Sequence, residues 1–320
     1  MVRCIGALLG LAFACCTAFA APFAYITNQG SHDVSVIDLA QQRVVATVPV
    51  GRSPAGVVAA GGRAFISNPD SRDISVIDMA SQSVVRTLEA GQGPVGIDAA
   101  PDGRRLFVAD WYANELLVYD DTASTATKPS ARIAVGHAPA GVAADGGDIV
   151  YVAERDDDSV AAVSLRERRV VARAKVGTHP FALLLDAPRR RLYALNVLSD
   201  DISVIDLAKP GAMPVVATVH VGKAPYGAAL AAGGTLLYVS NQHDDSVSVI
   251  DAATLAPLRT LEGFGYPEGI AAYEDKVYVV NWMDDALSVL DAASGRELRR
   301  IRTGKNSRGF GAFIGAPTPP

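Results

Sequence analysis

Short apolar runs alternate with turns rich in Gly, Asp and Ser along most of the chain, and the runs recur with a regular spacing. A quartet led by an aromatic residue occurs seven times, at Tyr25, Phe65, Phe107, Tyr151, Tyr193, Tyr238 and Tyr278. A second apolar run closes thirteen residues after each of them, at Asp38, Asp78, Asp120, Ser164, Asp206, Asp251 and Asp291. Because this offset never varies while successive quartets lie 40 to 45 residues apart, the length differences fall in the connections.

A Gly-x-x-Pro-x-Gly motif precedes the quartets from the second copy onward. It first appears at Gly51–Gly56, and its proline position is filled by Pro54, Pro94, Pro139, Pro180, Pro225 and Pro267, with Ser307 in the last copy. Each unit predicts four short strands. The first follows the motif proline, as at 55–59, and the second carries the quartet. The third, as at 33–38, alternates like a half-buried strand, and the fourth follows it, as at 43–48. Four strands every 42 residues or so, without helical periodicity, are typical of β-propeller blades.

The two ends of the repeat predict how the ring closes. The first quartet begins on a second strand near Phe23, and the last segment, 309–314, is a spare first strand. That strand can complete the first blade and remove an exposed edge. We therefore predict an all-β fold, a single seven-bladed propeller of four-stranded antiparallel blades over 21–315, followed by a flexible tail at 316–320.

The quartets Tyr25–Asn28 and Tyr238–Asn241, the Val-Ser-Val-Ile-Asp strands and the Gly-x-x-Pro-x-Gly loops resemble the YVTN-repeat, or YncE-like, family of seven-bladed propellers. The resemblance extends over essentially all of the chain after residue 20. It implies an exported binding or scaffold protein. One branch of the family is associated with single-stranded DNA, and more distant relatives include quinoprotein subunits and lactonases.

The first twenty residues have the character of an export signal. They contain Arg3, an apolar run over 5–13 and an Ala-Phe-Ala ending at Ala20, which together predict a cleaved secretory signal peptide and a periplasmic or secreted location. All three cysteines, Cys4, Cys15 and Cys16, fall within this segment. A lipoprotein signal is the alternative, although neither Cys15 nor Cys16 has a leucine three residues before it. After cleavage we expect no transmembrane segment.

Composition narrows the function classes further. The chain is 49% hydrophobic and 20% charged, as globular proteins are, and 29 basic residues against 34 acidic ones give a net charge of −5. This balance weighs against a general binder of nucleic acid or anionic membranes, although a local basic patch is compatible with it.

Most of the repeated residues have structural explanations. The turn Asp can accept hydrogen bonds from turn amides, and the Asn that ends most quartets is expected to act similarly and to tolerate a left-handed backbone. The recurring glycines, such as Gly96, lie where seven innermost strands crowd the axis. Function is therefore to be sought where one blade departs from the others.

The loops entering the first strands and those joining second to third strands are expected to open on one face, the binding mouth. We predict ligand-binding residues there, namely Arg52, Trp111, His137, Arg155, His179, Lys223, Tyr266, Trp282, Lys305 and Arg308. Trp111 and Trp282 occupy the same repeat position in blades three and seven, so they should face each other across the mouth. Stacking on a planar ligand is one interpretation of these tryptophans, and packing on neighbouring loops is the other.

A second departure lies in blades three to five. Asp110 and Glu154 replace the quartet Asn, and His137 and His179 lie in entering loops nearby. Such a set could bind a divalent metal or perform acid–base chemistry, or it could be scattered rim residues. The chain has no Gly-x-Ser-x-Gly, His-Glu-x-x-His or phosphate-loop motif.

The sequence thus favours an exported, monomeric binding protein over an enzyme. The ligand is expected to be a small molecule, a single-stranded nucleic acid or an exported partner protein, with basic and aromatic mouth residues suited to an anionic or planar ligand. We assign no catalytic residue, cofactor or metal. The alternative is an enzyme or enzyme subunit of lactonase or quinoprotein type that uses the polar set of blades three to five.

Overall fold

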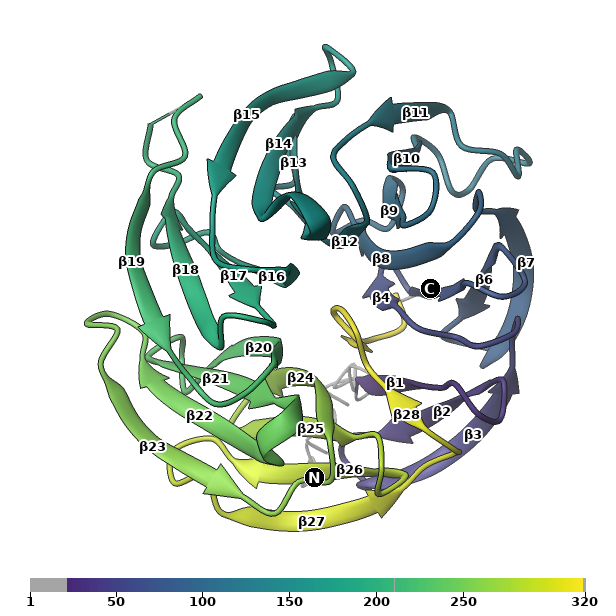
Figure 1. Cartoon of the computed structure of the whole chain (residues 1–320). Helices are drawn as coiled ribbons and strands as arrows, with labels where there is room; N and C mark the ends of the chain where they lie inside the picture. Colours follow the sequence, from purple (N-terminus) through teal and green to yellow (C-terminus); the bar gives the residue numbers. More distant parts are fainter. Residues whose placement is uncertain (1–21, 210, 319–320) are drawn as a thin grey trace, which may run out of the picture.

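The computed structural model describes residues 22–209 and 211–318, which form seven antiparallel sheets arranged around one central axis (Figure 1). The predicted signal segment and the last two residues of the predicted tail lie outside the described residues. Within the part that is described, no helix is long and apolar enough to cross a membrane. The predicted all-β, seven-bladed architecture is confirmed.

The first three blades follow the repeat closely. Blade one contains β1 (Phe23–Asn28), β2 (Asp33–Asp38) and β3 (Arg43–Pro49), completed by β28 (Ser307–Arg308) and β29 (Ile314–Gly315). Blade two contains β4 (Val57–Ala60), β5 (Arg63–Asn68), β6 (Asp73–Asp78) and β7 (Ser83–Glu89). Blade three contains β8 (Pro94–Ala99), β9 (Leu106–Asp110), β10 (Glu115–Tyr119) and β11 (Ala131–Ala134).

The remaining four blades have the same order from the axis outward. Blade four contains β12 (Pro139–Ala144), β13 (Ile149–Glu154), β14 (Ser159–Ser164) and β15 (Arg169–Lys175). Blade five contains β16 (Pro180–Asp186), β17 (Arg191–Asn196), β18 (Asp201–Asp206) and β19 (Val215–His220). Blade six contains β20 (Pro225–Ala231), β21 (Leu236–Asn241), β22 (Ser246–Asp251) and β23 (Pro257–Glu262). Blade seven contains β24 (Pro267–Tyr273), β25 (Lys276–Asn281), β26 (Ala286–Asp291) and β27 (Glu297–Arg302).

The closing segment does complete blade one, but not as one continuous strand. The short strands β28 and β29 pair with the two ends of β1, while Phe310 and Ala312 between them accept hydrogen bonds from the backbone of β4 in blade two. Gly311 has a φ of 122°, which only glycine adopts without strain, and this permits the excursion. The closing segment therefore links two blades and reaches toward the axis, as the yellow loop in Figure 1 shows.

The repeated polar residues hold turns and strands together. The Asp38 carboxylate accepts the amide of Gln41 at 2.8 Å, and Asp78, Asp206, Asp251 and Asp291 accept turn amides in the same way, as predicted. Asp120 differs, because its carboxylate accepts the hydroxyl of Ser130. The expectation that the quartet Asn accepts a turn amide holds for Asn28, whose Oδ1 accepts the Gly304 amide of the entering loop at 3.1 Å, but the left-handed backbone is not at the Asn. The Asn28 amide donates to Asp33 at 2.6 Å and to Ser35 at 2.9 Å on the next strand, and the left-handed residue is His32, four positions later. The Asn therefore fixes strand pairing while the turn residue absorbs the strain.

The core lies between the blades. The quartet aromatics are buried, and those of blades one, two, three, five, six and seven are almost completely inaccessible. Crowding at the axis explains the glycines, because a Cβ on Gly96 would collide with the backbone carbonyl of Ala140 on the next blade's inner strand. The inner strands are thus held close enough to position a narrow central site.

Candidate functional site

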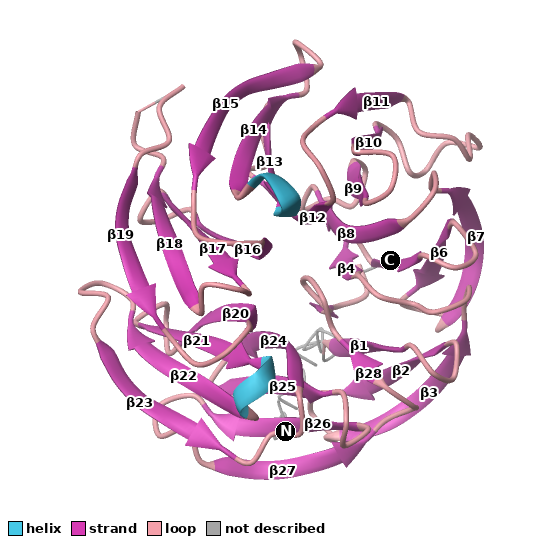
Figure 2. Cartoon of the chain, viewed as in Figure 1, coloured by secondary structure: helices cyan, strands magenta, loops and turns pink. Residues whose placement is uncertain are grey.

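Entering loops and second-to-third-strand loops share one face, which we call the mouth. The Arg52 amide donates to Ser71 at 2.9 Å, the His137 amide to Asp157 at 2.7 Å, and the Lys223 amide to Asp244 at 2.6 Å. The 3-10 helices η1 (Arg155–Asp157) and η2 (Gln242–Asp244), cyan in Figure 2, belong to these loops. The predicted common face is confirmed by these contacts.

One repeat position carries a different residue in almost every blade and surrounds the axis at the mouth. It is the residue between the proline and the glycine of the entering motif, occupied in chain order by Ala55, Val95, Ala140, Phe181, Tyr226, Glu268 and Arg308. Blades two to four supply small apolar side chains, blades five and six supply aromatic ones, and blades seven and one supply opposite charges. Small residues on one side of the axis and large ones on the other leave an off-centre space.

That space is the mouth pocket, a cavity of about 310 Å³. Its lining includes Trp111, Tyr112, Phe181, Tyr226, Arg308 and Phe310. This volume lies at the lower end of the ~300–1,000 Å³ typical of small-molecule sites, and the mixture of aromatic walls with few polar groups is also typical.

The aromatic side chains of the mouth pocket contact one another in a continuous series. The Phe181 ring stacks on Tyr226 with centroids 4.5 Å apart, lies 4.8 Å from Phe310 and is 6.1 Å from Trp111. The guanidinium of Arg155 lies 5.3 Å from the centre of the Trp111 ring, and that of Arg308 lies 5.8 Å from the Tyr226 ring. These contacts hold the rings in place and give the pocket a rigid aromatic wall.

A buried ion pair adjoins these rings. Arg308 forms a bidentate contact with Glu268, with Nε to Oε2 at 2.6 Å and Nη2 to Oε1 at 3.2 Å, and also donates to the Tyr226 hydroxyl at 2.5 Å. Gln242 donates to the same carboxylate at 3.0 Å. Burial raises the pKa of Glu268, and the adjacent guanidinium opposes that rise. Since every Glu268 contact is a donor to a carboxylate, we assign the pair as ionised.

Two of the predicted ligand-binding residues, Trp111 and Arg308, line the mouth pocket, and a third, Arg155, contacts the Trp111 ring from outside the lining. The other tryptophan does not line it. Trp282 packs on Tyr266 at 5.5 Å, and Tyr266 packs on His243 at 5.5 Å, which forms a separate outer aromatic cluster. The two tryptophans, which we expected to face each other across the mouth, thus pack in separate clusters, because Phe181 lies against Trp111 and the entering loop of blade seven places Tyr266 against Trp282. Packing on a loop was one of the two interpretations, and for Trp282 the loop belongs to its own blade.

The remaining predicted residues are distributed around the rim. Arg52, His137, Lys223 and Lys305 are exposed, and His179 is half-buried. Several have acidic partners: His137 Nδ1 lies 2.9 Å from Asp157, which raises the pKa of His137, and Lys223 lies 4.0 Å from Asp244. The rim is thus less basic than the list of cations predicts.

The polar set of blades three to five does not converge. Asp110 accepts the amides of Gln92 and Gly93 at 2.8 and 2.9 Å, so it shapes its own entering loop. Glu154 is fully buried and binds Arg173, Ser159 and the Gly136 amide. Within residues 22–209 and 211–318, no three His, Cys, Asp or Glu side chains gather as a metal site requires.

Two residues that line the pocket, Phe181 and Tyr226, and the buried partner of Arg308, Glu268, were not predicted from the sequence. Each lies between the proline and the glycine position of the entering motif. The constant residues of that motif have a structural explanation, and the variable residue between them carries no signal within a single copy. Comparing that single position across all seven copies would have identified the ring, because it is the place where chemistry changes from blade to blade.

Comparison with known proteins supports the architecture. A family model described as a YNCE-like β-propeller matches residues 130–317. No curated protein matches the sequence significantly.

Several solved structures are similar in fold. Hydrazine synthase from Kuenenia stuttgartiensis has a TM-score of 0.74 at 17% identity, covering 89% of this chain and 99% of that one. A functionally unknown protein from Desulfotomaculum acetoxidans has a TM-score of 0.76 at 14% identity, covering 93% and 99%. Dihydro-heme d1 dehydrogenase NirN has a TM-score of 0.68 at 16% identity, covering 91% and 74%. At these identities the likeness extends to the fold alone.

Proposed function

For this chain, which belongs to the YNCE-like β-propeller family, we propose a binding function in which the mouth pocket holds a planar ligand. The observation that carries the proposal is the series of contacting rings from Trp111 through Phe181 to Tyr226, open to a cavity of about 310 Å³. Stacking of a planar ligand on such a ring is worth about 1–3 kcal/mol, as measured for bases on aromatic side chains.

Charge pairing favours a compact planar ligand over a long anionic strand. Arg308 is bound by Glu268, Arg155 contacts Asp156, and His137 and Lys223 lie beside aspartates. An extended single strand would need a row of unpaired cations along its phosphates. A small ligand with one anionic group remains compatible if that group lies beside Arg308, which lines the pocket, and away from Asp70, which also lines it.

The alternative is an exported enzyme or enzyme subunit of lactonase or quinoprotein type, and it has weaker support. It would require the polar groups of blades three to five to meet at one point, whereas Asp110 and Glu154 are each fully engaged in holding their own loops. We further propose that the protein acts in the periplasm or outside the cell, on the basis of its N-terminal sequence pattern.

Single-tryptophan fluorescence tests the pocket directly, because the chain has two tryptophans. In Trp282→Phe, the remaining Trp111 reports on the mouth pocket. In Trp111→Phe, the remaining Trp282 reports on the outer aromatic cluster and serves as the matched control. Three probes separate the ligand classes: lumichrome is planar and neutral, flavin mononucleotide is planar and anionic, and oligodeoxythymidylate is a flexible single strand.

We expect saturable quenching of Trp111 by both planar probes and only weak, non-saturable quenching of Trp282. Oligodeoxythymidylate should bind more weakly than either planar probe at physiological salt. Equal quenching of the two tryptophans, or strand binding tighter than that of the planar probes, would contradict a mouth pocket built for a compact planar ligand.

A further inference from the structure

A second cavity lies deeper along the axis than the mouth pocket. The inner strands run inward from the mouth, and residues 182–185, 228–230 and 270–272, which follow the ring at the mouth, line a space of about 430 Å³. We call this space the channel cavity. Phe310 lines both cavities. The exposed residues Gly311 and Ala312 also line the channel cavity, which gives it access to solvent.

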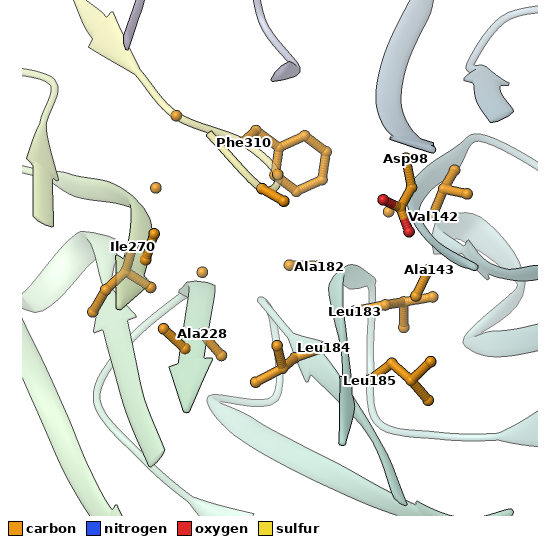
Figure 3. A pocket seen from close by; sticks show the side chains of 18 of the residues that line it. Asp98, Val142, Ala143, Ala182, Leu183, Leu184, Leu185, Ala228, Ile270 and Phe310 are labelled. Atoms are coloured by element: carbon orange, nitrogen blue, oxygen red, sulfur yellow. The ribbon is translucent and has the colours of Figure 1, made fainter. Parts of the chain in front are cut away.

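The side chains that line the channel cavity are aliphatic or aromatic with one exception. Figure 3 shows Leu184, Ala228 and Ile270 around it and the carboxylate of Asp98 on one side with its oxygens toward the open space. Among the described residues that line this cavity, Asp98 carries the single ionisable side chain.

Asp98 departs from its own repeat. It is paired in register with the quartet aromatic Phe107. In blades two, four, five, six and seven the corresponding residue opposite the quartet aromatic is apolar, namely Val58, Ala143, Leu184, Ala229 and Ala271. A residue that served the blade would recur in the others, so the carboxylate is specific to this point of the axis.

The bonding of Asp98 leaves its charge uncompensated. Oδ1 accepts its neighbour Ala99's amide at 2.8 Å, and Oδ2 accepts the amide of Ala144 on the inner strand of blade four at 2.8 Å. A carboxylate offers about four acceptor sites, so capacity remains toward the cavity. Burial raises the pKa of Asp98 to about 6, the two amides oppose the rise, and no charged side chain contributes. At neutral pH the cavity therefore holds a negative charge without a counter-ion, an arrangement that a bound cation would stabilise.

We propose that the channel cavity is a second binding site, independent of the mouth pocket, for a small apolar amine. The ammonium group donates hydrogen bonds to Asp98, and the hydrocarbon body packs against the aliphatic wall formed by residues such as Leu184 and Ile270. A neutral ligand of the same shape could donate a hydrogen bond but would leave the negative charge uncompensated, and an anion would be repelled by it.

Calorimetric titration of the full chain with n-hexylamine and n-hexanol tests the proposal. The two probes share a hydrocarbon body and differ in the group that would meet Asp98. At pH 7.5 we expect the amine to bind at least about tenfold more tightly than the alcohol, because both can donate a hydrogen bond to Asp98 but only the ammonium compensates its charge. At pH 5.0 about nine-tenths of the Asp98 carboxyl should be protonated, so amine binding should weaken about tenfold while alcohol binding stays unchanged.

Two variants distinguish the effect of the Asp98 charge from the effect of the volume of the channel cavity. Asp98→Asn should remove the preference for amine and its pH dependence. Ala228→Leu, which fills part of the cavity from another inner strand, should weaken both probes together and covers the case in which Asp98→Asn fails to fold. Equal affinity of amine and alcohol, pH-independent amine binding, or no binding of either probe would overturn the proposal.

Discussion

Replacing Glu268 by glutamine removes the counter-ion of Arg308 while leaving the side chain nearly unchanged in size. The Glu268 side chain is 2% exposed and that of Arg308 is 19% exposed. Removing one partner of a buried pair costs about 3–5 kcal/mol, because the remaining charge stays out of water. Two features reduce this cost: Arg308 is partly exposed, and glutamine keeps some of the hydrogen bonds of Glu268. We therefore expect Glu268→Gln to lower the free energy of unfolding by about 2–3 kcal/mol.

Urea unfolding, followed by circular dichroism and by fluorescence, measures this loss. With an m-value of about 3 kcal/mol/M, the midpoint should fall by about 0.7–1 M at constant m. Adding Arg308→Met to Glu268→Gln should recover most of the stability, because the double variant buries no charge. Asp156→Asn is the surface control: it removes the partner of Arg155 in an exposed pair and should change the free energy of unfolding by less than about 0.5 kcal/mol.

A Glu268→Gln variant that unfolds within about 0.5 kcal/mol of the native protein would show that Arg308 does not depend on this counter-ion. A double variant less stable than Glu268→Gln alone would show that the cost does not come from an unpaired buried charge.

Three further predictions concern the fold and its pH dependence. Gly96→Ala should lose the cooperative thermal transition because its Cβ meets the Ala140 carbonyl, whereas Gly147→Ala, in an exposed turn, should melt like the native protein. Phe313→Ala removes a fully buried side chain from the closing segment and should cost about 3–5 kcal/mol in urea, with faster hydrogen exchange in β1. Burial raises the pKa of Asp98 from 3.8 in the unfolded chain to about 6 in the folded one. The free energy of unfolding should therefore be highest below pH 4, where the carboxyl is protonated, and should fall by up to about 3 kcal/mol as the pH rises through 6. Urea unfolding of Asp98→Asn should not show this loss.

The blades and their order could be predicted from sequence because each is specified locally. The spacing between the quartet and the turn Asp is constant, and the entering motif recurs before each quartet from the second onward. Spacing along the sequence is therefore enough to predict the strands and the blade that the C-terminal segment completes. The course of the closing segment could not be foreseen, because it depends on hydrogen bonds between Phe310 and a strand more than 250 residues away.

The site was predicted only in part, for a related reason. Arg308 was identified as a mouth cation, but its partner Glu268 lies 40 residues earlier, and nothing in the local sequence of either indicates a buried pair. Trp111 and Trp282 share a repeat position yet face different neighbours, because Phe181 reaches one and Tyr266 reaches the other. Repeat position places a residue on a face, and packing between blades decides its role.

Native mass spectrometry of the protein, purified from the cell envelope of its own source organism, tests whether the mouth pocket holds a ligand. We predict that the native chain and Trp282→Ala retain the same small bound molecule and that Trp111→Ala retains at most about a tenth as much. Full retention of the molecule in Trp111→Ala, or its loss in Trp282→Ala, would contradict a ligand site in the mouth pocket.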